Sequence, residues 1–252
     1  MVKGLNVFRN HFRDYFNRYI IIGGTACDLA MEEAGLTFMA TKDLDIVLCI
    51  EALDRKFVEA FWNFIRKGEY QIQEKASGKK QYYRFKKPAN ETFPYMLELF
   101  SRKPDALSLA DESHLTPIPV EEEVSSLSAI LLDDDYYSFI NQGKRDRDGL
   151  SIIGADRLIP LKARAWLDLR RRKEQGEKID FNNIRKHKND VFRLYQVIEP
   201  DNHIPLPAKI AYDLQNFFGL ISTEAIDLKS LGLGSNTVES IITDLKRIYG
   251  LD

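Results

Sequence analysis

A short apolar strand that stops at two glycines is the feature that most constrains the fold of this 252-residue chain. The run Tyr19–Ile22 is rich in β-branched residues, which favours a strand, and Gly23-Gly24 ends it abruptly. Helical spacing follows from Thr25 to Ala34, and Gly35 is a natural C-terminal stop. A second apolar strand is expected over Asp43–Ile50. The order strand, helix, strand predicts an α/β core rather than a helical bundle or a β-sandwich.

The hydrophobic periodicity of the other segments predicts further strands and helices in the first hundred residues and mainly helices after them. In the first hundred residues we expect helices at Val7–Tyr19 and Leu53–Lys67 and strands at Tyr70–Glu74, Gln81–Lys86 and Tyr95–Phe100. Later we expect a strand near Pro117–Val120, helices at Ser125–Asn141, Asp156–Gln175, Lys186–Ile198, Pro207–Phe218 and Ser235–Tyr249, a charged loop at Lys144–Asp148 and a strand at Gly149–Ile153. The predicted fold class is α+β, a mixed sheet flanked by helices and followed by a helical C-terminal region. We place the domains at residues 1–145 and 146–252.

Composition excludes several classes of protein. The chain has 36 Lys and Arg against 38 Asp and Glu, so any affinity for nucleic acid must come from a local patch. Cys27 and Cys49 stand in apolar runs without metal-ligand spacing, which indicates reduced, buried thiols. No apolar run approaches the roughly 20 residues of a membrane span, and the first ten residues are too polar for a signal peptide. We therefore expect a cytoplasmic protein without a membrane partner.

The Gly23-Gly24-Thr25 turn is the first candidate for chemistry. Two glycines between a strand and a helix let an anion approach the backbone amides, and the helix N-terminus favours negative charge. Thr25 adds a hydroxyl at a capping position. A purely structural turn explains these residues equally well when they are considered alone.

The second candidate is the segment Lys42-Asp43-Leu44-Asp45. Residues two apart on a strand point to the same face, so the two carboxylates project together. They repel each other and need a compensating cation, and paired oxygen ligands suit Mg²⁺. The alternative is a solvated strand edge, but the apolar run after Asp45 indicates a strand buried on both faces.

The third candidate is Glu98, a lone acid within an apolar strand. A buried carboxylate without a partner is costly, so Glu98 should be paired or bind a ligand. On a strand beside Asp43 and Asp45 it would complete a three-carboxylate cluster that can hold two metal ions and activate an attacking hydroxyl. An exposed strand face explains Glu98 taken alone.

In this order the motifs Gly23-Gly24-Thr25, Asp43-Leu44-Asp45 and Glu98 resemble the DNA polymerase beta-like nucleotidyltransferase superfamily, over about residues 19–100. The resemblance implies transfer of a nucleotidyl group from a nucleoside triphosphate to an acceptor hydroxyl. It further implies two Mg²⁺ ions, or Mn²⁺ in their place, held by the three acids as catalytic residues. The residues that it assigns to nucleotide binding are Gly23, Gly24, Thr25 and, directly before the acidic motif, Lys42.

The second half of the chain resembles the AbiEii-like nucleotidyltransferase toxins more loosely. Those toxins carry a lysine on a helix after the core and a Lys-Asp-type motif on the next helix. Leu161-Lys162-Ala163-Arg164-Ala165 and Lys186-His187-Lys188-Asn189-Asp190-Val191 are similar to these motifs. The resemblance implies that Lys162 contacts the triphosphate and that Asp190 positions Lys162 or the acceptor. It also implies an RNA acceptor such as tRNA and an antitoxin protein as partner.

Two other functions stay open from the sequence. One is nucleotidylation (AMP transfer) of a protein side chain, and the other is a nucleotide-binding module that has lost turnover. The basic run Arg170–Lys173 has two interpretations. Its cations are favoured at the end of a helix and simply face solvent, or they form a surface that steers RNA together with Arg185, Lys186 and Lys188. His187, among these lysines, is expected at the surface.

Overall fold

The computed structural model describes residues 2–38, 41–49, 52–72, 82–100 and 133–251. These residues divide into two compact units. The first contains the described residues up to 100 together with 144–154, and the second contains 133–143 and 155–251. The chain therefore returns to the first unit for one short segment, and the boundary expected between residues 145 and 146 falls inside that segment.

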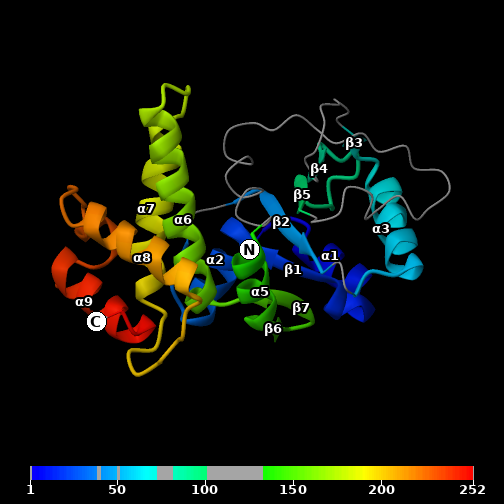
Figure 1. Cartoon of the computed structure of the whole chain (residues 1–252). Coiled ribbons are helices and arrows are strands. Elements are labelled where there is room, and N and C mark those ends of the chain that lie inside the picture. The colour runs from blue at the N-terminus through cyan, green and yellow to red at the C-terminus, as the bar shows by residue number, and fades with distance from the viewer. Residues whose placement is uncertain (1, 39–40, 50–51, 73–81, 101–132, 252) are drawn as a thin grey trace. The chain divides into compact units, whose positions relative to one another are not determined.

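In the described part of the chain, a mixed sheet of seven strands forms the centre of the first unit (Figure 1). Its strands are β1 (Tyr19–Ile22), β2 (Asp43–Leu48), β3 (Gln71–Ile72), β4 (Tyr82–Lys86), β5 (Met96–Phe100), β6 (Lys144–Arg147) and β7 (Leu150–Ile153). They lie in the order β3-β4-β5-β2-β1-β7-β6, with β2–β5 and β1–β7 parallel and the other neighbours antiparallel. The central strands β1, β5 and the second half of β2 are buried on both faces of the sheet, which is why their apolar runs are nearly continuous.

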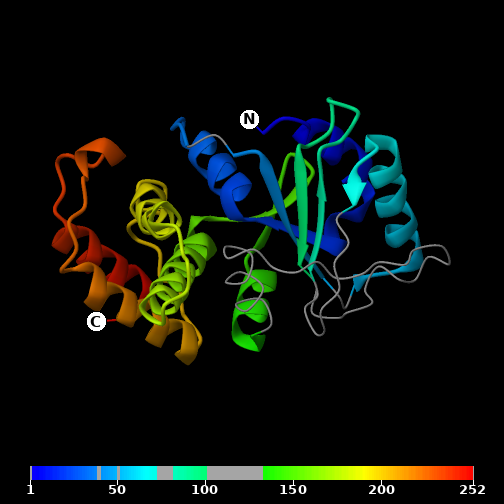
Figure 2. The same ribbon diagram turned by 90° about the horizontal axis from the view of Figure 1, so that it is seen from above.

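The helical segments of the first unit are α1 (Leu5–Phe12), η1 (Arg13–Arg18), α2 (Gly23–Glu33) and α3 (Arg55–Gly68). Helices α1 and α3 lie on the same side of the sheet (Figure 2). Aromatic rings join them to it: Phe12 on α1 lies 5.2 Å from Phe64 on α3 and 6.1 Å from Tyr19 on β1, centroid to centroid. Each fully buried ring removes a large apolar area from water, so this cluster anchors both helices.

The second unit is helical in its described residues. It contains α5 (Asp134–Gln142), α6 (Ala155–Glu174), α7 (Phe181–Tyr195), α8 (Ala208–Ile221), the short 3₁₀ segment η3 (Lys229–Leu231) and α9 (Val238–Tyr249). Trp166 on α6 is fully buried and meets Phe217 on α8 edge to face at 5.3 Å. The buried Tyr136 hydroxyl donates to Asp213 Oδ2 at 2.9 Å and ties α5 to α8. None of the helices in the described ranges has both the length and the apolar composition to cross a bilayer.

The expected fold class, a mixed sheet flanked by helices and followed by a helical region, is confirmed. Several local expectations were wrong. The single helix expected over 7–19 ends at Phe12 and continues as η1, and the charged loop expected at 144–148 contains strand β6. Strand β6 was not predicted because an edge strand, which pairs on one side only, can consist entirely of charged residues. Charged residues at a sheet edge also discourage aggregation with other chains. The helix expected at 125–141 begins at Asp134, with Asp133 at its N-cap, and the helix expected at 186–198 spans Phe181–Tyr195. The strand expected near 117–120 lies outside the described residues.

Candidate active site

Two aspartates at the start of β2 share one face of the sheet. Asp43 and Asp45 are half-buried, whereas Leu44 between them is fully buried on the opposite face. This alternation is the period of two that a strand imposes. Because the two carboxylates carry like charge on one face of one strand, the arrangement favours a cation near them.

Glu98 of β5 lies directly beside Asp45 in the register of the sheet, and Arg84 of β4 lies directly beside Glu98. Partners in register project to the same face, so Arg84, Glu98 and Asp45 form a row across three strands. Arg84 Nε donates to Glu98 Oε1 at 2.8 Å, and Arg84 Nη2 lies 2.7 Å from the same oxygen. Both side chains are buried. The lone acid therefore has a charged partner, as its burial requires.

Arg84 is absent from the candidates that the sequence suggested. A signal for it exists, because Arg84 is flanked by aromatic residues in a strand, just as Glu98 is flanked by leucines. A single cation and a single acid in two apolar strands that follow each other along the chain are natural partners if the strands pair. Without the pairing register, however, nothing in the sequence brings these two residues together.

The Gly23-Gly24 turn lies against the side chain of Asp45. Ile22 is the register partner of Asp45, and α2 begins at the next residue. Gly23 has a φ of +65°, and a Cβ placed on it would lie 1.7 Å from Asp45 Oδ2. Glycine is therefore required at this position for two reasons, the backbone conformation and the space. The N-terminus of α2, where free backbone N–H groups gather, lies next to the Asp45 carboxylate.

The other two residues assigned to nucleotide binding differ in their surroundings. Thr25 is fully buried, and its hydroxyl donates to the backbone carbonyl of Asp43 at 2.8 Å. The expectation that Thr25 caps the helix was wrong, because the N-cap position is Ile22 and no side chain caps α2. Thr25 instead fixes the start of α2 to the start of β2. Lys42 is exposed beside the acidic pair.

The aspartate pair fits a hard divalent cation by its donor chemistry. Mg²⁺ usually binds through one or two carboxylates and completes its octahedron with water and substrate phosphates. Among the described residues, no group of three His, Cys, Asp or Glu side chains is close enough to hold a metal ion. Asp43 and Asp45 are thus the residues that could hold Mg²⁺ here, while Oε1 of Glu98 is occupied by Arg84.

Lys162 on α6 and Asp190 on α7 form a buried ion pair in the second unit. Lys162 Nζ donates to Asp190 Oδ2 at 2.7 Å, and the two side chains are 7% and 1% exposed. Arg193 Nη1 lies 3.4 Å from the other oxygen, Asp190 Oδ1. Because both charges are withdrawn from water, loss of either partner would leave the other buried and uncompensated, which is strongly destabilising.

His187 is less exposed than its lysine neighbours suggest. Its Nδ1 is buried and has no hydrogen-bond partner among the described residues. Burial, followed by the positive charges of Lys162 and Lys186, lowers the pKa of His187 well below its ordinary value of 6.5. His187 is half-buried rather than exposed, because it lies on α7 one turn from the buried Ile184 and Asp190.

No known family model matches this chain, and no curated protein does so either. Among solved structures, the fold is similar to that of an antigenic nucleotidyltransferase-like protein from Paracoccidioides brasiliensis. The similarity has a TM-score of 0.43 at 14% sequence identity and covers 90% of this chain and 89% of that chain. A functional assignment therefore has to rest on this chain's own residues.

Proposed function

We propose that this protein is a Mg²⁺-dependent nucleotidyltransferase that transfers a nucleoside monophosphate group from a nucleoside triphosphate to an acceptor hydroxyl on RNA. One observation carries the proposal: Asp43, Asp45 and Glu98 share a face of the sheet, and Asp45 adjoins the glycine turn at the N-terminus of α2. A helix N-terminus attracts phosphate, but the neighbouring carboxylates repel it. A divalent cation between them resolves this conflict.

Each group of residues has a distinct part in the proposed reaction. Gly23 and Gly24 allow the triphosphate to approach the backbone N–H groups of α2, and Lys42 adds a positive charge. Asp43 and Asp45 would hold Mg²⁺, which when bound offsets the negative charge of the phosphates. The acceptor oxygen forms a bond to the α-phosphorus, the bond to pyrophosphate breaks, and Glu98 takes the hydroxyl proton. Positioning and charge compensation account for the catalysis, without a covalent intermediate.

Lys162 and Asp190 enter the proposal as a unit. The carboxylate of Asp190 holds the Lys162 ammonium in one place within the second unit. That Lys162 also serves as a cation for the triphosphate is part of the proposal. The biological setting that we propose is a toxin that modifies RNA such as tRNA and is kept in check by an antitoxin protein.

The test is incubation of the full chain with each α-³²P-labelled triphosphate, Mg²⁺ and either total RNA or lysate protein. We expect label in RNA, and we expect Asp43→Asn to abolish it, because a neutral amide holds Mg²⁺ poorly. Asp14→Asn is the matched control, since Asp14 is an exposed aspartate on η1. Label in protein instead of RNA would favour protein nucleotidylation. Turnover by Asp43→Asn at the wild-type rate would reject the proposed site.

A nucleotide-binding module without turnover is the second candidate. Two contacts favour it: Arg84 occupies Oε1 of Glu98, and the Thr25 hydroxyl is committed to the Asp43 carbonyl. In that case the chain should bind a triphosphate with Mg²⁺ in isothermal titration calorimetry, yet transfer no label to either acceptor. Asp43→Asn should then weaken the measured binding.

A further inference from the structure

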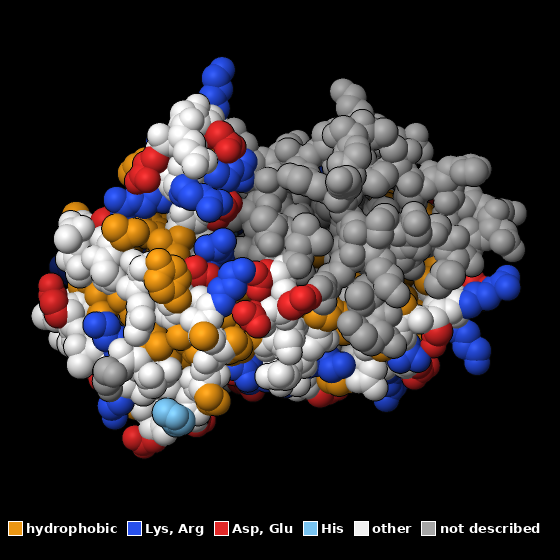
Figure 3. Space-filling model, viewed as in Figure 1, with side chains coloured by type: hydrophobic (Ala, Val, Ile, Leu, Met, Phe, Trp, Pro, Cys, Tyr) orange, Lys and Arg blue, Asp and Glu red, His pale blue; other side chains and the backbone are white. Residues whose placement is uncertain are grey.

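A groove in the second unit has no part in the proposed transfer site. It has a volume of about 410 Å³ and is lined by residues of α6, α7 and the segment after α8, namely Trp166, Arg170, Lys173, Glu174, Phe181, Ile184, Arg185, Lys188 and Glu224. This volume is in the range of ligand-binding clefts. Lys and Arg side chains lie among Asp and Glu side chains around this part of the surface (Figure 3).

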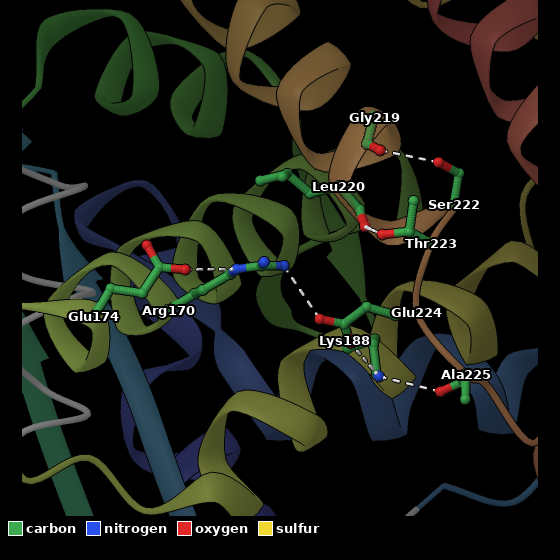
Figure 4. Close-up of polar contacts among 9 residues, drawn as sticks. All are labelled: Arg170, Glu174, Lys188, Gly219, Leu220, Ser222, Thr223, Glu224 and Ala225. Carbon is green, nitrogen blue, oxygen red and sulfur yellow. Dashed lines mark hydrogen bonds and ion pairs between the residues drawn. The ribbon is translucent and has the colours of Figure 1, made fainter.

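The acidic residues of the groove are already neutralised. Glu224 accepts from Arg170 Nη1 at 3.1 Å and from Lys188 Nζ at 2.6 Å, so it lies between two cations (Figure 4). Glu174 accepts from Arg170 Nε at 3.0 Å. Four cations therefore face two acids, and both acids are engaged with Arg170 or Lys188. The groove has a surplus of positive charge.

Lys173 and Arg185 supply this surplus. Lys173 Nζ lies 3.4 Å from the carbonyl oxygen of Ile179, and Arg185 Nη2 donates to the neutral Asn182 Oδ1 at 3.0 Å. Within the described residues neither of them forms an ion pair. Their charge is available to an anionic ligand.

Phe181 gives the groove an accessible aromatic ring. It is the first residue of α7 and is 65% exposed, which is unusual for a phenylalanine. Lys173 Nζ lies 4.7 Å from the ring centroid. A cation on one face leaves the other face of the ring for a planar partner.

We propose that this groove binds an unpaired segment of RNA, with one base stacked on Phe181 and the phosphates beside Lys173 and Arg185. Aromatic platforms next to a positive groove are the features that proteins use for single strands. An acidic peptide would pair its carboxylates with Lys173 and Arg185 but would leave the exposed ring of Phe181 unused, whereas a base stacks on it. Trp166 is fully buried and Arg170 covers it at 5.1 Å, so Phe181 is the ring that a base can reach. The choice of RNA over DNA rests on the proposed function.

Fluorescence anisotropy with a fluorescein-labelled 12-nucleotide oligouridylate and the full chain tests this, without triphosphate or Mg²⁺. Phe181→Ala should raise the Kd about tenfold, since one stacked base is lost, whereas Phe181→Trp should retain binding. The double variant Lys173→Gln/Arg185→Gln should weaken binding and reduce the slope of log K against log salt by roughly 1.4, for two phosphate contacts.

Matched controls lie outside the groove lining. Tyr212→Ala removes an aromatic side chain that is 64% exposed on α8, and Lys229→Gln removes an exposed lysine; both variants should bind like the wild type. Unchanged affinity in Phe181→Ala and in the double variant would overturn the inference. Phe181-dependent binding of a labelled acidic peptide instead of RNA would also overturn it and make the groove a protein-docking site.

The test of RNA binding in the groove can fail or succeed independently of the test of nucleotidyl transfer. Asp43→Asn should bind the oligouridylate with wild-type affinity even though it transfers no nucleotide. RNA binding that depends on Phe181, without label transfer by the wild type, would support the groove and reject the nucleotidyltransferase. Label transfer to RNA, together with a Kd that does not change in Phe181→Ala, would support the nucleotidyltransferase and reject the groove as an RNA site.

Discussion

Arg84 and Glu98 form a buried ion pair on neighbouring strands, with Arg84 Nη2 2.7 Å from Glu98 Oε1. Arg84 Nε also donates to this oxygen, at 2.8 Å. The pair has two consequences. It allows an acid to lie in the apolar strand β5, and it fixes the side chain of Glu98 in the row that continues to Asp45 on β2.

Removing the cation should therefore destabilise the first unit. Arg84→Met leaves a buried, uncompensated carboxylate, and we expect the free energy of unfolding to fall by about 3–5 kcal/mol. The double variant Arg84→Met/Glu98→Leu should recover most of this loss, because it removes both charges. Urea denaturation followed by circular dichroism measures both effects. A loss below about 0.5 kcal/mol for Arg84→Met would mean that the pair is solvated like a surface salt bridge.

Gly23 offers a test of the contact between the glycine turn and the aspartate pair. Gly23→Ala places a Cβ 1.7 Å from Asp45 Oδ2 at a φ of +65°, so the Asp45 side chain must move. We expect a loss of about 2–4 kcal/mol in unfolding free energy, combining backbone strain and overpacking. Nucleotidyl transfer should be lost as well, because the metal ligand is displaced.

Gly35 is the matched control for this substitution. It has a φ of +72°, and a Cβ there would meet nothing within 4 Å. Gly35→Ala should therefore cost only the strain of a left-handed alanine, about 1 kcal/mol, and leave transfer intact. Equal losses of stability and activity in the two variants would show that the contact with Asp45 is unimportant.

The sequence alone predicted those parts of the fold that have strong local signals. The strand Tyr19–Ile22 was identified with its observed bounds, because β-branched residues end at two glycines. The long helix α6 was expected within one residue at each end. Strand β6 was missed because its four charged residues carry no alternation of apolar and polar positions. Its identity as a strand depends on pairing with β7, a contact that no local pattern encodes.

In the candidate site, too, some residues could be predicted from local patterns and others depend on strand pairing. Asp43 and Asp45 belong to one strand, so their common face follows from the period of two. The neighbour relation of Asp45 and Glu98 depends on the parallel pairing of two strands that are about fifty residues apart in the chain. The position of Arg84 beside Glu98 depends on a further register, that of β4 against β5, which is why Arg84 was missed. The partial burial of His187 was missed because its nearest neighbours in sequence, Lys186 and Lys188, are cations typical of a surface.

Breaking the buried pair of Lys162 and Asp190 should cost far more stability than breaking an exposed pair, because it leaves one buried charge uncompensated. Asp190→Ala leaves the Lys162 ammonium buried without its 2.7 Å partner, and we expect a loss of about 3–5 kcal/mol in unfolding free energy. The comparison is Glu59→Ala, which breaks the exposed 2.8 Å pair with Arg55 on α3 and should cost less than about 0.5 kcal/mol. Urea unfolding of both variants measures the difference. Similar losses would contradict the assignment of a buried pair.

His187 should make the stability of the protein depend on pH near neutrality. Its pKa in the folded state lies well below the ordinary value of 6.5, chiefly because it is buried and secondarily because Lys162 and Lys186 are close. Below pH 6.5 the unfolded chain therefore binds a proton that the folded chain does not. The free energy of unfolding is highest above pH 6.5 and falls as the pH drops, by at most about 1.4 kcal/mol per unit for this one group.

Urea denaturation at pH 7.5, 6.5 and 5.5 tests this dependence, since this range lies above the ordinary titration range of the carboxylates. His187→Gln replaces the ring with a side chain that does not titrate, so the decline between pH 6.5 and 5.5 should become shallower. A direct check is the NMR titration of the His187 ring proton, which should keep the chemical shift of the neutral imidazole through pH 6.5. A midpoint at or above 6.5, or the same decline in His187→Gln as in the wild type, would show that this ring is accessible to water.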